Sequence, residues 1–205
     1  MANATAAFGL RPVRHRNGSP WNGQTMKCYV SSSYATAIYI GDTVTQSLVA
    51  AEKDPTGRYR TVNKTTLTDG IVPIGVVVGI EPNPDNLNRV YLPASTGGII
   101  RVCPADPDIV FQVRDDGGAT PTSAFVGLNA IMVATSAGDT VTGISGHHMD
   151  AGTGTAPGAN QSYPLFILGL SDTPDNSLGI NAVWDVILNT SYNATGLILG
   201  VTTTS

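Results

Sequence analysis

The residues IGVVVGI at positions 74–80 form an unbroken apolar run in a chain of 205 residues. Apolar, mostly β-branched residues at consecutive positions indicate a strand that is buried on both faces. The two glycines of the run would allow a β-bulge or the close approach of a second strand. We therefore expect residues 74–80 to lie at the centre of the core.

Short runs of β-branched and aromatic residues recur on both sides of this strand, separated by clusters of Gly, Pro, Asn and Asp. No long segment has the periodicity of a helix. The sequence therefore predicts an all-β fold, a β-barrel or a β-sandwich of many short strands. The expected strands are Met26–Val30, Ala37–Ile40, Thr43–Val49, Arg58–Val62, Ile71–Ile80, Arg89–Leu92, Ile99–Cys103, Ile109–Val113, Asn129–Ala134, Thr140–Ile144, Tyr163–Leu170, Val183–Asn189 and Gly196–Thr202.

Residues 1–25 differ from the rest of the chain because they contain small residues, two prolines, three arginines and an isolated tryptophan. We interpret them as an extended basic N-terminal arm and residues 26–205 as a β-rich body. The N-terminus has no apolar stretch typical of a signal peptide, and no apolar run approaches the roughly 20 residues of a membrane helix. Cys28 and Cys103 are too few for a disulfide framework, so we expect free thiols in a reducing compartment.

The charged residues are few and unevenly distributed. They make up 13% of the chain, against about 25% in a typical soluble protein. Residues 1–41 contain four basic residues and no acid, whereas the chain from Asp115 onward contains seven aspartates and no Lys or Arg. This separation would let the arm dock on an acidic surface of its own fold or of a neighbour.

The arm supplies the residues expected to bind a partner. Arg11, Arg14 and Arg16 would donate charge-assisted hydrogen bonds, and Trp21 would be an apolar anchor in a pocket of the partner. Nucleic-acid binding is not expected, because only the arm is basic while the body is acidic.

Sequence tests for catalytic and metal sites fail. Ser145 lies in GISGH, but a nucleophile elbow requires glycine where His147 stands. His147 and His148 are adjacent, so a strand would point them to opposite faces; we expect a solvated loop pair instead. The glycine-rich residues 150–160 lack the Lys-Ser/Thr of a phosphate-binding loop. No enzyme activity and no cofactor are predicted.

Two acidic pairs, Asp106 with Asp108 and Asp115 with Asp116, follow neither the calcium-loop pattern nor the setting of glycosidase carboxylates. Neighbouring proline and glycine residues favour turns at both places. Trp184 lies in an alternating strand and is expected to pack in the core or between subunits.

Several motifs in order carry a resemblance to a known class of protein. They are FGLRPVR at 8–14, GDTV at 41–44, IGV at 74–76, ADPDIVFQV at 105–113, VGLNA at 126–130 and DNSLG at 175–179. The series resembles the virion proteins that decorate the heads of tailed bacteriophages, called decoration or cement proteins. The resemblance implies a protein made in the host bacterial cytoplasm that binds the capsid exterior and has no catalytic residues.

The expected partners are thus the major capsid protein and further copies of this chain, most simply in a trimer. A second hypothesis is a tail or fibre module that recognises a host glycan, although only 6% of the residues are aromatic. A third is a hydrolase that depends on Ser145 or Asp106. A main shell protein is a further alternative, but the long helix of the usual shell fold is not predicted.

Overall fold

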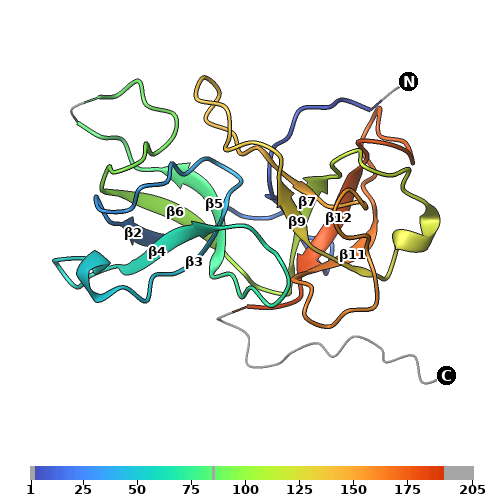
Figure 1. The fold of residues 1–205 in the computed structure, drawn as a ribbon, viewed down its shortest axis with the longest axis horizontal. Helices are drawn as coiled ribbons and strands as arrows, with labels where there is room; N and C mark the ends of the chain where they lie inside the picture. Colours follow the sequence, from blue (N-terminus) through green and yellow to red (C-terminus); the bar gives the residue numbers. More distant parts are fainter. Residues whose placement is uncertain (1–2, 85, 192–205) are drawn as a thin grey trace.

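The computed structural model describes residues 3–84 and 86–191 and is built almost entirely from β-strands (Figure 1). Two three-residue 3-10 turns, η1 and η2, are its only helical elements in these ranges. The elements are β1 (Arg11–His15), β2 (Met26–Val30), β3 (Thr43–Gln46), η1 (Ala50–Glu52), β4 (Arg60–Thr65), β5 (Gly75–Ile80), β6 (Gly98–Pro104), β7 (Ile109–Arg114), η2 (Ser123–Phe125), β8 (Asn129–Ala130), β9 (Met132–Ala134), β10 (His147–Met149), β11 (Leu165–Leu170) and β12 (Val183–Leu188).

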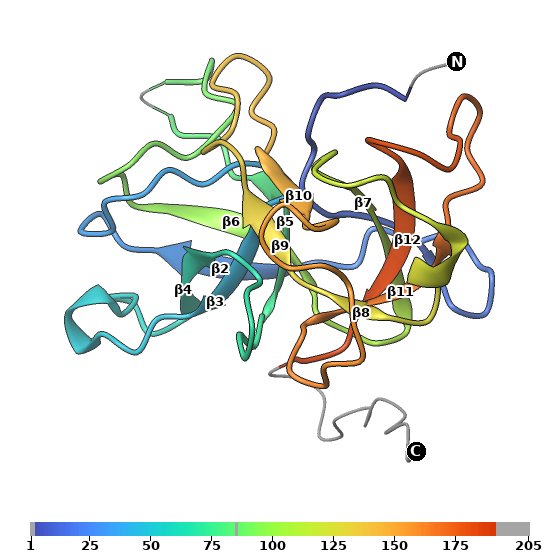
Figure 2. The ribbon, with the colours of Figure 1, turned by 45° about the vertical axis from the view of Figure 1, so that its right-hand side comes forward.

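The strands form two main parts side by side (Figures 1 and 2). Five strands close a barrel in the order β2-β4-β3-β5-β6, with β2 parallel to β4. The other part is a five-stranded antiparallel sheet in the order β1-β7-β12-β11-β8, accompanied by the β9–β10 hairpin. The prediction of an all-β fold with many short strands is confirmed, and a closed barrel is one of its components.

The expectation for residues 74–80 is confirmed in its first part: residues 74–77 are buried, whereas Val78, Gly79 and Ile80 of β5 are partly buried. Val77 lies inside the barrel, whereas Val76 belongs to a second cluster shared with Phe111 and Trp184 of the sheet. The register of β5 against β6 shifts between Val77 and Gly79, which is the irregularity that the glycines allow. One strand therefore fills two cores, because its alternate side chains point to opposite faces.

Most other expected strands are confirmed with changed boundaries, but three are not. These three segments form isolated bridges and turns at residues 37–40, 89–92 and 140–144. Ile38 forms a single bridge with Leu92, and Ile40 forms a single bridge with Ile144. The expected strand at 196–202 lies outside the described residues.

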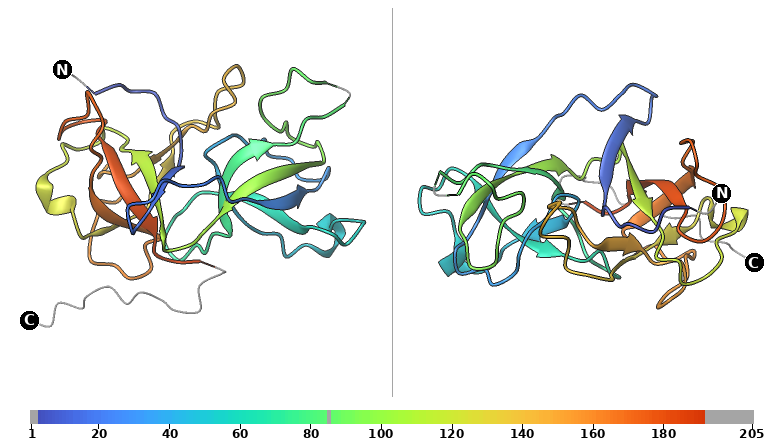
Figure 3. Two further views of the ribbon diagram at one scale, coloured as in Figure 1. Left: turned by 180° about the vertical axis from the view of Figure 1, so that it is seen from behind. Right: turned by 90° about the horizontal axis from the view of Figure 1, so that it is seen from above.

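The sequence analysis missed β1 and β10. β1 pairs antiparallel with β7 as an edge strand of the sheet, and the preceding Leu10 is buried in the shared core. Residues 10–15 thus pack on the sheet of the body, and the division of the chain at residue 25 stays a prediction. Figure 3 shows this N-terminal segment, in blue, passing along the junction of the two parts.

Three segments meet that junction at Gly41. Its carbonyl oxygen accepts a hydrogen bond from the Leu10 N–H at 2.9 Å, and its own N–H donates to Val77 O at 2.8 Å. The adjacent Ile40 N–H donates to Gly143 O at 2.8 Å. Gly9 and Gly41 both have positive φ, 66° and 93°, and a Cβ on either would overlap the other segment's backbone. The N-terminal segment is thus fixed to the barrel by backbone contact.

We expect Gly75→Ala to lower the free energy of unfolding by at least about 3 kcal/mol, because strain and overpacking in a core have costs of this order. A Cβ at Gly75 would overlap the backbone carbonyl of Cys103 on β6. Gly79→Ala on the same strand is the matched control, since its Cβ would lie 3.7 Å from Arg101 Cβ, an ordinary contact. Urea denaturation followed by circular dichroism measures both; equal effects would show that the close approach is unimportant.

Candidate partner-binding face

The basic N-terminal residues are bound largely by the protein's own sheet. The Arg14 guanidinium forms an ion pair with Asp185 on β12, with an N–O distance of 2.9 Å. Arg11 Nη2 donates a hydrogen bond to Gln112 Oε1 on β7 at 2.6 Å. The charge distribution allowed the basic residues to dock on an acidic surface of the same fold or of a neighbour. Arg14 docks on the same fold, through Asp185.

The other two predicted contact residues lie differently. Arg16 is exposed, and its backbone N–H donates to Asp108 O at 2.8 Å. Trp21 is partly buried against the shared core, and its role as an apolar anchor for a partner stays a prediction. Its buried indole N–H has no hydrogen-bond acceptor among the described residues.

Trp21 is one wall of a pocket of about 400 Å³ that we call the apolar groove. The groove lies where the N-terminal segment, β5 and the 138–146 loop meet. Phe8 and Arg11 also line it. Its apolar residues are Leu10, Pro12, Trp21, Ile40, Val77, Val78 and Ile144.

A second pocket, of about 440 Å³, shares Phe8 and Arg11 with the groove, and we call it the arginine cleft. Arg114, at the end of β7, and Arg11 both contact the Phe8 ring: their guanidinium carbons lie 5.6 and 4.9 Å from its centroid. Such distances are those of cation–π contacts. Within the described residues neither arginine forms an ion pair with a carboxylate. Groove and cleft together make one face with an apolar half and a cationic half.

Two neighbouring loops also carry exposed apolar side chains. The 81–97 and 138–146 loops lie side by side in Figures 1 and 2 and touch where Gly143 meets the backbone of Val90. Val141 is 83% exposed and Leu87 is 74% exposed. Of these loops, the 138–146 loop reaches the groove, through Ile144.

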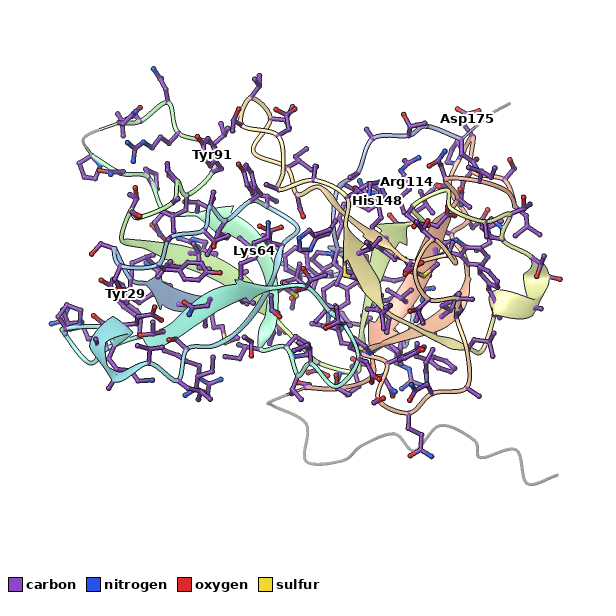
Figure 4. The ribbon with its side chains drawn as sticks, viewed as in Figure 1. Tyr29, Lys64, Tyr91, Arg114, His148 and Asp175 are labelled. Carbon is purple, nitrogen blue, oxygen red and sulfur yellow. The ribbon has the colours of Figure 1, made fainter. Side chains whose placement is uncertain are left out.

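Behind the groove lies a buried ion pair between Asp42 and Lys64, with an N–O distance of 2.9 Å. Asp42 also accepts hydrogen bonds from the Tyr39 N–H at 2.8 Å and from Ser145 Oγ at 2.6 Å. Lys64 Nζ donates to Ala137 O at 2.9 Å, and Figure 4 shows Lys64 pointing from the barrel toward the junction. The pair therefore connects the barrel to the 134–146 segment.

This arrangement gives no support to a serine nucleophile. Ser145 is 1% exposed, donates to Asp42 and accepts only the backbone N–H of His147. In the described chain neither ring nitrogen of His147 has a hydrogen-bond partner, so no imidazole contacts the Ser145 hydroxyl, and the carboxylate that does, Asp42, is itself paired with Lys64. The expectation that the protein is not an enzyme stays a prediction.

The expectation of solvated histidines is wrong, because His147 and His148 lie on β10 and are both buried. Burial lowers the pKa of His147 to about 4; Asp42 opposes this change, and Lys64 and His148 add to it. Burial also lowers the pKa of His148, whose Nδ1 lies 2.8 Å from Thr135 Oγ1. The two rings face different surroundings, as expected for neighbours on a strand.

The acidic pairs act in turns, as predicted. Asp106 accepts the Asp108 N–H at 2.9 Å, and Asp116 accepts the Gly118 N–H at 3.1 Å. Asp115 is fully buried, accepts the indole N–H of Trp184 at 3.2 Å, and has a pKa raised by burial. Trp184 is a core residue, which was one of its two expected roles.

Further chemical features are few in the ranges that the structure describes. No group of three or more His, Cys, Asp or Glu side chains there could hold a metal ion. Cys28 and Cys103 are free and buried, and burial raises their thiol pKa values to about 11 and about 12. No helix among these residues has the length and apolarity needed to cross a membrane.

Sequence reasoning identified Arg11 and Trp21 but missed Phe8, Ile144 and Arg114. One signal was present: Arg114 is the last basic residue of the chain and stands directly before the acidic half. Nothing in the sequence placed the 138–146 loop against the N-terminal segment, because the contact joins residues more than 100 positions apart.

The chain matches no protein-family model, no curated protein and no solved structure. The resemblance to phage decoration proteins therefore stays a prediction.

We expect Leu10→Ala to lower the free energy of unfolding by about 2–5 kcal/mol, the usual cost of truncating a buried leucine. Leu10 is 1% exposed within the shared core. Leu48→Ala, at a position 79% exposed, should change it by less than about 0.5 kcal/mol. Chemical denaturation tests this, and a negligible effect of Leu10→Ala would mean that residues before β1 are not part of the folded unit.

We expect stability to fall as the pH drops from about 6.5 to about 4. The folded pKa of His147, about 4, lies below its ordinary value of 6.5. The unfolded chain therefore binds the proton first, and at pH 4 folding loses roughly 3 kcal/mol through this residue. His147→Leu should remove that part of the pH dependence and be as stable as the wild type, or more so, at pH 7, because an unpaired buried imidazole is unfavourable. Parallel stability–pH curves for both proteins would contradict this.

Proposed function

We propose that this protein is a structural component of a bacteriophage virion, which binds the outer surface of the capsid and stabilises the shell. The observation that carries the proposal is the face made by the apolar groove and the arginine cleft. It is an apolar and cationic surface on a chain that is otherwise poor in charge.

The fold has no internal need of this surface. The barrel encloses one core and the sheet a second, which β5 and Leu10 complete. Ile144, which lines the groove and is 36% exposed, belongs to neither core. Apolar surface that does not serve folding favours binding to a partner.

The order of sequence motifs supports the choice of a phage capsid as that partner. The major capsid protein is the proposed target, and a small homo-oligomer, most simply a trimer, is the proposed form. An oligomer engages several sites of a lattice at once, so contacts of modest affinity add up to a firm hold.

A lightly charged exterior fits the same role. Charged side chains make up 13% of the chain, which suits a surface largely covered by neighbours better than that of a free monomer. Arg14 and Asp185, which bind each other, are excluded from the proposed contact, whereas Arg11 and Trp21 remain in it.

One observation favours the alternative of a glycan-binding tail module. A pocket of about 360 Å³ beside the 81–97 loop is lined by Tyr91, Glu81 and Arg89, residue types that bind sugar rings and hydroxyls. Tyr91, labelled in Figure 4, already stacks on Tyr39 with ring centroids 5.0 Å apart. A glycan array probed with the purified protein separates the two functions: a reproducible sugar ligand lost in Tyr91→Ala would favour the tail module.

We expect Ile144→Asp to reduce binding to capsids that lack this protein by at least tenfold, because a carboxylate in the groove would be desolvated there. Val126→Asp is the matched control. Val126 is 47% exposed beside η2 and does not line the groove. Cosedimentation with stripped particles measures the bound copies, and cryo-electron microscopy of the native particle locates them. Density confined to the tail, or equal binding of both variants, would contradict the proposal.

A further inference from the structure

We infer that the face binds an acidic, apolar segment of a partner protein, with a carboxylate between Arg11 and Arg114 and an adjacent apolar side chain in the groove. The inference rests on the proposed function only for the identity of the partner. The recognition chemistry itself is a property of the isolated chain.

The Arg114 guanidinium is held in place without being neutralised. Its Nη1 donates to the carbonyl oxygens of Ala4 and Asn181, the latter at 3.2 Å. Its Nε is buried without an acceptor among the described residues. Burial lowers the pKa of Arg114, and the charge of Arg11 adds to this effect. Neutral carbonyls fix the direction of the group but leave its charge uncompensated.

The nearby acids compensate the charge of Arg114 only in part. Asp115 opposes the lowering of the Arg114 pKa without outweighing burial, and its carboxylate accepts Trp184 Nε1 at 3.2 Å and Asn181 N at 2.8 Å and forms no ion pair with either arginine. Asp175 lines the cleft and forms no ion pair with either arginine. Figure 4 shows Arg114 and Asp175 in this region, on the side of the sheet near the N-terminal segment.

The side chains that line the cleft carry two positive charges, from Arg11 and Arg114, and one negative charge, from Asp175. The buried Asp115 next to Arg114 reduces this excess further, so the cleft suits a single carboxylate better than a doubly charged phosphate. Both guanidinium groups line this one pocket and contact the same Phe8 ring, at 4.9 Å for Arg11 and 5.6 Å for Arg114. Arginine forks bind carboxylates with paired, charge-assisted hydrogen bonds.

The groove specifies what stands beside the carboxylate. Because Phe8 and Arg11 line both pockets, an extended segment crossing Phe8 would place neighbouring side chains in each. Trp21 is among the residues that line the groove, so an apolar side chain seated there would pack against it. A protein segment is favoured over nucleic acid because the formal charge of the whole chain is −4, which repels a polyanion.

The test measures binding of a fluorescein-labelled peptide, LELDLE, to the purified full chain by fluorescence anisotropy. The peptide LQLNLQ, which replaces each carboxylate by an amide, is the matched ligand control. We expect the acidic peptide to bind at least tenfold more tightly. Arg11→Gln and Arg114→Gln should each weaken that binding at least tenfold, and Arg58→Gln, at an exposed arginine outside both pockets, should change it less than twofold.

Circular dichroism checks that the variants fold. Arg11 is exposed, so Arg11→Gln is expected to fold, and it keeps the test decisive if Arg114→Gln fails to fold. Equal binding of both peptides, no binding, or no effect of Arg11→Gln would overturn the inference. Tighter, Arg11-dependent binding of a labelled hexathymidine would overturn the choice of a carboxylate.

Failure of the inference and of the proposed function are distinguishable. Capsid binding that persists in Arg11→Gln would reject the carboxylate contact and leave the capsid role intact. Peptide binding without capsid binding would reject the capsid role and leave the acidic segment as the ligand.

Discussion

The constraint on which the structure depends is that strand β5 must serve two cores at once. Val77 fills the barrel, and Val76 fills the core that the barrel shares with the sheet. Because neighbouring side chains of a strand point to opposite faces, only a strand that is apolar on both sides can do this. Gly75 adds a steric requirement, since β6 passes too close for any side chain there.

The partner-binding face follows from how the segments cross at that strand. Gly41 hydrogen-bonds to β5 and to the N-terminal segment, and the adjacent Ile40 bonds to the 138–146 loop. The buried pair of Asp42 and Lys64 fixes the same crossing from within. Removing one partner of such a pair leaves an uncompensated charge, so the crossing has a single favourable arrangement. The groove walls come from segments that this crossing brings together.

The parts of the fold that local pattern determines were predictable, and those that depend on long-range pairing were not. The apolar composition of residues 74–80 predicts a buried strand, and the glycine and proline residues beside the acidic pairs predict turns. β1 contains two arginines and a proline and has no alternation, so only its pairing with β7 makes it a strand. His147 and His148 are polar by composition, yet tertiary contacts bury them. Arg11 and Trp21 were identified from charge and isolation, but Arg114 required the sheet.

The relation between the two halves of the charge distribution explains why only some arginines serve recognition. Arg14 points to Asp185, whose strand lies next to β7 in the sheet, and the two charges cancel. Arg11 is three residues earlier on the same strand, opposite Gln112, which offers a neutral oxygen. Arg114 likewise meets carbonyl groups. The sheet thus pairs one arginine for stability and leaves two with neutral partners, and a carboxylate from outside is the group that would complete their electrostatics.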